Sequence, residues 1–277
     1  MTRREGTALP LKDIIVHLDR GPGCTARFMA AIDLARTHKA CLKGLYAISH
    51  PYYAPQSAID GDYAEVRSFF INAASKSGVV AEWLYVDWNV IGVPLSEMIT
   101  FHAYATDLLV IGQPHDGRSV RRGNHEPVEH LILGTGRPVV VFPSDGNTYQ
   151  FGTKVLVAWR GGRESARALH DALPLLEKAS EVYIIAVVSG EAEREREYAS
   201  LSALNEHLTR HAIAASVTII DRESRPVADL LLDQVRDSGA DLLVMGGFTY
   251  GLRGAPVFGE LSREMLNRMT VPILFSH

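Results

Sequence analysis

The sequence has 277 residues, a length that suits about two domains. Hydrophobic residues make up 47% and charged residues 22%, as in ordinary globular domains. The formal net charge of −4, without a basic run, argues against nucleic-acid binding. Two cysteines are too few for a disulfide framework, and no apolar stretch reaches the roughly 18 residues of a membrane span. Because the start also lacks a signal-peptide pattern, we expect a cytoplasmic protein with no membrane partner.

In the first half, short apolar runs alternate with amphipathic stretches. The runs are typical of central parallel strands, and they lie at residues 14–18, 42–48, 80–86, 108–111 and 139–142. The stretches between them have helical spacing, first through Phe28, Ile32 and Ala35, then at 63–77, from Pro94 to about 102, and at 126–133. Residues 50–61 are expected to form a loop.

The second half repeats this order. Strands are predicted at 155–159, 182–188, 217–220, 242–245 and 273–275, with helices through Ala166 and Leu169, near 191–211, near 226–237 and near 260–268. This alternation of strand and helix indicates an α/β fold with a parallel sheet and right-handed crossovers. We expect the charge-rich run from Glu191 to Glu197 to be a solvated helix face, with partner docking as the alternative.

The two halves also share sequence. Residues 107–112 read Asp-Leu-Leu-Val-Ile-Gly, and residues 241–246 read Asp-Leu-Leu-Val-Met-Gly. The duplication predicts two tandem domains, residues 1–147 and 152–277, divided at the polar turn segment 144–148. The closing strands of the two copies are candidates for edge-to-edge pairing, because apolar edge strands must be covered. We therefore expect an internal pseudo-dimer, and a homodimer remains open.

These repeated runs resemble the universal stress protein family in its tandem two-domain form. The residues that carry the resemblance are Leu18-Asp19, 105–112 and 136–139 in the first copy, and 155–159, 240–246 and 270–272 in the second. The resemblance implies two Rossmann-like or flavodoxin-like domains, each a five-stranded parallel sheet flanked by helices. It also implies adenine-nucleotide binding in some members, and pairing of domains through their last strands.

Nucleotide-binding members carry an Asp at the end of the first strand and a loop with the pattern Gly-x2-Gly-x9-Gly-Ser/Thr. Glycines let backbone N–H groups approach the phosphates, and the next helix adds its dipole. The first copy keeps Asp19 and Gly112, but His115 and His125 replace the other two glycines. Glu126 and Pro127 follow, and they bring a negative charge and a missing N–H donor. We interpret this phosphate site as lost.

The second copy departs from the pattern differently. It keeps Gly246, Gly259 and Ser262, but Thr249 replaces the middle glycine and Glu260 stands where Ser or Thr is expected.

The Asp at the end of the first strand is also missing from the second copy, where Arg160 takes its place. A guanidinium group cannot accept a hydrogen bond, so the usual nucleotide contact is lost there. Arg160, Arg163 and Arg253 would either favour a small anion or be solvated surface arginines.

Asp19 itself has two interpretations. It either contacts a ligand or caps the helix that follows, since Asp near a helix start bonds unpaired N–H groups. The chain has no G-x-S-x-G elbow, Walker loop or H-E-x-x-H motif, so no catalytic constellation is predicted.

The sequence therefore predicts a universal-stress-type, stress-response protein that acts as a ligand-binding or adaptor module with degenerate nucleotide sites. Its ligand would be an adenine nucleotide or another small anion, and its protein partner is unknown. One alternative is a switch that binds ATP or AMP through the second domain. The other is an α/β enzyme with an unrecognised pocket around Asp19, His115 and His125.

Overall fold

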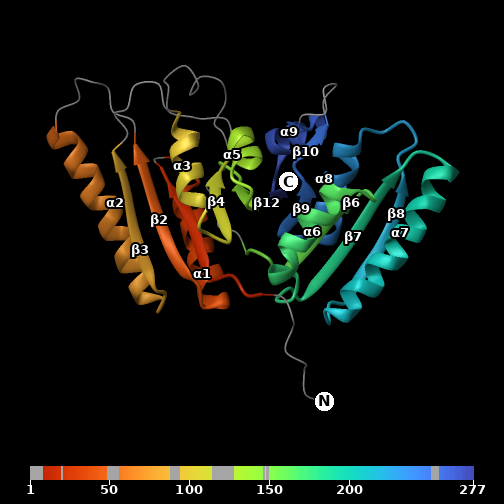
Figure 1. Ribbon diagram of the computed structural model, residues 1–277, viewed down its shortest axis with the longest axis horizontal. Coiled ribbons are helices and arrows are strands. Elements are labelled where there is room, and N and C mark those ends of the chain that lie inside the picture. Colours follow the sequence, from red (N-terminus) through yellow and green to blue (C-terminus); the bar gives the residue numbers. More distant parts are fainter. Residues whose placement is uncertain are drawn as a thin grey trace, which may run out of the picture. The chain divides into compact units, whose positions relative to one another are not determined.

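The computed structural model describes residues 9–19, 21–48, 56–87, 94–113, 128–145, 147, 150–250 and 256–277. The chain divides into two compact units, Leu11–Thr148 and Tyr149–His277, and the second also takes in Leu9 and Pro10. In each unit strands alternate with helices along the chain (Figure 1).

The first unit contains a five-stranded sheet in which every pair of neighbouring strands is parallel. Its spatial order is β3-β2-β1-β4-β5. The strands are β1 (Asp13–Leu18), β2 (Cys41–Ile48), β3 (Ala81–Asp87), β4 (Leu108–Gly112) and β5 (Val139–Phe142). The helices are α1 (Cys24–His38), α2 (Gln56–Lys76), α3 (Leu95–Ala103) and α5 (Val128–Gly134). The order changes direction between β1 and β4, which places a ligand-binding switch point at their carboxyl ends.

Side-chain packing fixes which helices share a face of this sheet. Phe28 of α1 and Phe70 of α2 have ring centroids 5.1 Å apart, so these two helices lie on the same face. A Cβ atom on Gly44 of β2 would come within 2.6 Å of the Phe70 ring, so α2 sits directly on the sheet there. Right-handed crossovers place α3 and α5 on the opposite face, where they pack against each other.

The second unit repeats the arrangement with the order β12-β9-β6-β7-β8, again with parallel neighbours. Its strands are β6 (Lys154–Trp159), β7 (Glu181–Val188), β8 (Ala215–Asp221), β9 (Leu242–Gly246) and β12 (Ile273–Ser276). Its helices are α6 (Arg163–Leu176), α7 (Glu191–Arg210), α8 (Val227–Ser238) and α9 (Glu260–Arg268). The predicted α/β fold with two similar five-stranded parallel sheets is thus confirmed.

The repeated Asp-Leu-Leu-Val motif has the same structural role in both units. Asp107 Oδ2 accepts hydrogen bonds from the backbone N–H of Lys12 at 2.6 Å and of Asp13 at 3.0 Å. In the second unit, Asp241 accepts from the backbone N–H of Thr153 at 2.9 Å and of Lys154 at 3.1 Å. Each Asp thereby fastens the start of the first strand of its unit to the strand beside it.

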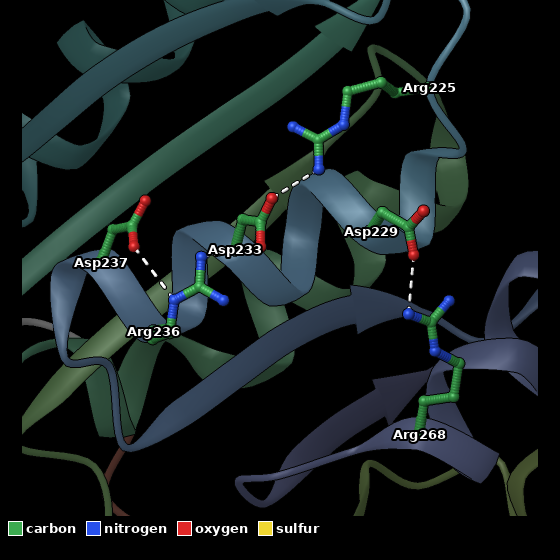
Figure 2. Close-up of polar contacts among 6 residues, drawn as sticks. All are labelled: Arg225, Asp229, Asp233, Arg236, Asp237 and Arg268. Atoms are coloured by element: carbon green, nitrogen blue, oxygen red, sulfur yellow. Dashed lines mark hydrogen bonds and ion pairs between the residues drawn. The ribbon is translucent and has the colours of Figure 1, made fainter.

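Helix α8 carries a network of ion pairs on its exposed side (Figure 2). Arg236 of α8 pairs with Asp233 at 2.8 Å, and Arg268 of α9 reaches Asp229 of α8 at 2.6 Å. The network also contains Arg225–Asp233 at 2.5 Å and Arg236–Asp237 at 3.3 Å. Exposed pairs of this kind add little stability, so we interpret the network as a solvated surface that orients α9 on α8.

Every helix in the described part of the chain is too short or too polar to span a lipid bilayer.

The largest shift in a predicted element is at the start of α2, which begins at Gln56 rather than near residue 63. Residues 50–61 were predicted to be a loop, and residues 56–61 are helical instead. The loop was predicted from the Pro, Tyr and Asp residues of this stretch. Extending an existing helix costs far less than starting one, so the packed part of α2 continues through residues of weak propensity.

Candidate functional site

In the first unit, Asp19 is bonded to groups of the protein itself. It lies directly after β1, where its Oδ1 accepts a hydrogen bond from the Gly21 N–H at 2.7 Å. Its Oδ2 accepts from Nη2 of Arg27 at 2.8 Å, and His17 Nδ1 lies 3.7 Å from the same oxygen. The carboxylate thus already has an anchored cation and a backbone donor.

Arg27 of α1 fills the space at the carboxyl ends of β1 and β4. Its side chain is only 3% exposed. Its Nε and Nη2 donate to the backbone oxygen of His17 at 3.1 and 2.9 Å. A Cβ atom on Gly112, the last residue of β4, would overlap Nη1 of Arg27. The guanidinium therefore occupies the switch point, and Gly112 serves the close approach of Arg27.

The charge of this pair is stabilised inside the unit. Burial by itself raises the pKa of Asp19, but Arg27, His17 and the Gly21 N–H together outweigh it, so the pKa is lowered. Asp19 is consequently ionised at neutral pH. Burial and the Asp19 charge raise the pKa of the neighbouring Cys24 thiol, which makes it a poor nucleophile.

The helix-cap interpretation of Asp19 is wrong. The N-cap of α1 is Gly23, and no side chain bonds to the first turn from that position. Asp19 lies four residues earlier and makes its backbone contact at Gly21 instead. Of the other residues predicted for the first site, Gly112 borders Arg27, whereas His115, His125, Glu126 and Pro127 lie outside the described residues.

In the second unit, the structure brings three of the predicted residues together. Gly246 ends β9, Gly259 is the N-cap of α9, and Ser262 lies in the first turn of that helix. The Ser262 Oγ donates to the backbone oxygen of Gly246 at 3.2 Å, and Ser262 is 4% exposed. A Cβ on Gly259 would come within 3.3 Å of the same Oγ. The Ser262 hydroxyl thus bonds the protein backbone.

The segment between these glycines forms a hairpin that we did not predict. β10 (Phe248–Tyr250) pairs antiparallel with β11 (Pro256–Phe258), in the register Phe248↔Phe258. Aromatic contacts hold the hairpin on the end of β12, with Phe258 5.8 Å from Phe275 and Phe248 5.0 Å from His277 between ring centroids. The segment that would supply a phosphate loop is instead paired with itself.

Just after β6, the first strand of the second unit, two backbone N–H groups are already bonded within the protein. Arg160 is exposed, and its backbone N–H donates to Ser165 Oγ at 3.1 Å. The next N–H, of Gly161, donates to Oε2 of Glu197 at 3.0 Å. Glu197 comes from α7 and is 3% exposed, so the expectation that the whole run 191–197 is solvated is wrong at this residue. The Glu197 side chain turns inward from α7 and gives the Gly161 N–H its acceptor.

Sequence reasoning missed Arg27 and Glu197 as site residues, and both come from helices far from the glycine pattern. Nothing in the local sequence marks either as buried, because charged residues are rarely buried unless paired.

The β10–β11 hairpin could have been predicted from the sequence. Two short runs rich in aromatic and β-branched residues are separated by five residues that include Gly251 and Gly254.

No group of three or more His, Cys, Asp or Glu side chains that could enclose a metal ion is found in the part of the chain that the structure describes. Cys24 and Cys41 both carry free thiols. At the carboxyl ends of the strands, the described residues thus form a buried ion pair in the first unit and internal hydrogen bonds in the second.

Comparisons with known proteins relate this chain to a protein family and to solved structures. Residues 153–277 match the family model described as the universal stress protein family. A comparison with curated proteins finds no match. The predicted resemblance is confirmed: the chain carries a universal stress protein domain over residues 153–277, and matches to solved structures over the whole chain are consistent with the tandem two-domain form.

Solved structures match along nearly the full length. A universal stress protein from Archaeoglobus fulgidus has a TM-score of 0.74 at 18% identity, with 95% of this chain and 97% of that chain covered. A candidate universal stress protein from Pseudomonas aeruginosa gives 0.65 at 15% identity, with 96% and 93% covered. The cytoplasmic domain of a prokaryotic cation chloride cotransporter gives 0.52 at 14% identity, with 95% and 94% covered. At these identities the structures establish the fold alone, while the family match supports a stress-response-type module.

Proposed function

We propose that this protein is a ligand-binding or adaptor module of the universal stress class in which both nucleotide sites are degenerate. In this proposal the protein does not turn nucleotide over, and its partner is another small anion or a protein. The observation that carries the proposal is the internal ion pair of Asp19, whose Oδ2 lies 2.8 Å from Nη2 of Arg27.

The first unit supports the proposal through both charge and space. The Asp19 carboxylate is paired with Arg27, whose side chain is 3% exposed. Because that pair already uses the carboxylate, it has less capacity to accept hydrogen bonds from a ribose or base. Replacing the ion pair with a nucleotide would leave the charge of Arg27 buried, and breaking such pairs is strongly unfavourable. Gly112 cannot offer its open backbone to phosphate while Arg27 lies against it.

The second unit supports the proposal because its described residues lack the hydrogen-bond acceptor and the open phosphate loop that a nucleotide would need. Arg160 stands where a hydrogen-bond acceptor would be needed, and a guanidinium has no acceptor. Strands β10 and β11 pair with each other between Gly246 and Gly259, so this segment has fewer N–H groups to offer a phosphate. The exposed Arg160 and Arg163 retain the capacity to attract a small anion.

A nucleotide switch in the second domain is the second candidate. It is favoured by one observation, the clustering of Gly246, Gly259 and Ser262 at the ends of β9 and α9. If this candidate holds, Gly259→Glu abolishes binding of ATP or AMP, because it places a carboxylate at the helix start. Asp19→Ala in the other unit then leaves binding intact, and the reverse pattern contradicts the candidate.

The enzyme alternative has less support. Asp19 has a lowered pKa and is held by Arg27, so it is a weak general base. His115 and His125, the other residues of that hypothetical pocket, lie outside the described residues.

Calorimetric titration of the full chain with ATP, ADP and AMP, together with an assay of phosphate release, tests the proposal. We expect no saturable binding at micromolar nucleotide and no phosphate release above buffer. Micromolar binding accompanied by hydrolysis would refute the non-enzymatic function. A parallel thermal-shift screen of small anions and metabolites then identifies the chemistry that does bind.

A further inference from the structure

Helix α7 ends in two histidines one turn apart. His207 lies in its last turn and His211 is its C-cap residue, so the pair has the spacing H-x-x-x-H. Residues four apart lie on one side of a helix. The two imidazole ring centroids are 4.7 Å apart. The His211 N–H donates to the backbone oxygens of His207 at 3.3 Å and Leu208 at 3.0 Å, so the backbone that carries both rings is held in place.

The position of the pair favours a cation. The last carbonyl groups of a helix lack intrahelical partners, and the helix dipole places partial negative charge there. Arg210 is also in this turn, but its guanidinium is directed to Glu206 at 3.9 Å. Both imidazoles are half-buried, so they are partly sheltered and still reachable from solvent.

We propose that His207 and His211 chelate a divalent transition-metal ion, with water in its remaining positions. Imidazole nitrogen suits copper, nickel and zinc, whereas magnesium prefers oxygen ligands. No three metal-ligating side chains converge among the described residues, so in that part of the chain these two rings are the whole contribution of the protein. This site lies outside the degenerate nucleotide sites and does not depend on them.

Titration of the metal-free full chain with Cu²⁺, Ni²⁺, Zn²⁺ and Mg²⁺ tests the site. Copper should bind most tightly and magnesium not at all, following the order of divalent-metal affinities. His207→Ala and His211→Ala should each weaken copper binding by about tenfold or more, since the loss of even a supporting group costs 10–100-fold. Unchanged melting temperatures of both variants in chelator will establish that they are folded.

His170→Ala is the matched control, because His170 is an exposed histidine on α6 that is not a ligand in the proposal. It should leave copper affinity unchanged. The chain has 11 histidines, so the readout is the loss of one binding site in each α7 variant against a constant background. Copper binding unaffected by both α7 substitutions, or equally reduced by His170→Ala, would overturn the proposal.

Discussion

Nη2 of Arg27 lies 2.8 Å from Oδ2 of Asp19, and both side chains are held at the carboxyl end of β1. The same guanidinium bonds the backbone oxygen of His17, and its other side borders Gly112 at the end of β4. One arginine thus joins the two strands between which the sheet order changes direction. The Asp19 carboxylate is thus held by contacts within the protein.

If the pair is structural, its two members should be energetically coupled. We expect Arg27→Gln to destabilise the fold by about 2–4 kcal/mol, since breaking a buried pair costs 3–5 kcal/mol and Asp19 retains 30% of its side-chain exposure. Asp19→Asn should cost a similar amount, because its amide still accepts hydrogen bonds but leaves the charge of Arg27 buried without a counterion. Urea unfolding of the single and double variants measures the coupling, and strictly additive losses would show that the two residues do not act together.

Gly112 should tolerate a methyl group only when Arg27 is absent. Gly112→Ala forces the guanidinium out of its place, and overpacking of this kind costs about 1–3 kcal/mol. In an Arg27→Ala background most of that penalty should disappear, because the overlapping atoms are gone. Chemical denaturation of the wild type, the two single variants and the double variant checks this expectation. An equal penalty with and without Arg27 would show that the added methyl group does not clash with the guanidinium.

The contribution of Asp19 should depend on pH in the acid range. Its pKa is lowered in the folded state, so its stabilising effect is complete above the ordinary value of about 3.9 and is lost as pH falls through the lowered pKa. The difference in unfolding free energy between the wild type and Asp19→Asn should therefore be constant near neutrality and shrink below about pH 4. A difference that stays constant down to pH 2 would argue against a charged pair.

Glu197 should stabilise the second unit although the helix around it is rich in charge. Its buried carboxylate accepts the Gly161 N–H at 3.0 Å, and Glu197→Ala leaves that donor without a partner. Because Gly161 is exposed, water can replace the lost acceptor, so we expect a loss of about 1 kcal/mol, the net worth of a typical hydrogen bond, by thermal or urea unfolding. Glu195→Ala, two residues away and exposed, is the matched control. Equal effects of the two substitutions would contradict the inward role of Glu197.

The strands and most helices could be predicted because the apolar residues of the sequence coincide closely with the buried positions of these elements. The runs that begin at Ile14 and Val155 are apolar on both sides, and this pattern occurs in sheets covered by helices on both faces. The repeated Asp107 and Asp241 were recognised as a family signature, and the structure gives their physical role, the fastening of the first strand of each unit.

The contacts at the switch points could not be predicted, because they join residues from different elements. Arg27 is eight residues from Asp19, and no local pattern distinguishes it from a solvated arginine on α1. Glu197 reaches Gly161 across 36 residues. The charge of each is tolerated in the interior only because a partner lies opposite, and that partner is known only once the fold is formed.

The central claim, that Asp19 is engaged within the protein and no longer serves a nucleotide, is tested most directly by titrating ATP into the wild type and into Asp19→Ala. We predict no saturable heat at micromolar ATP in either protein. Micromolar binding by the wild type that is abolished in a folded Asp19→Ala variant would contradict it.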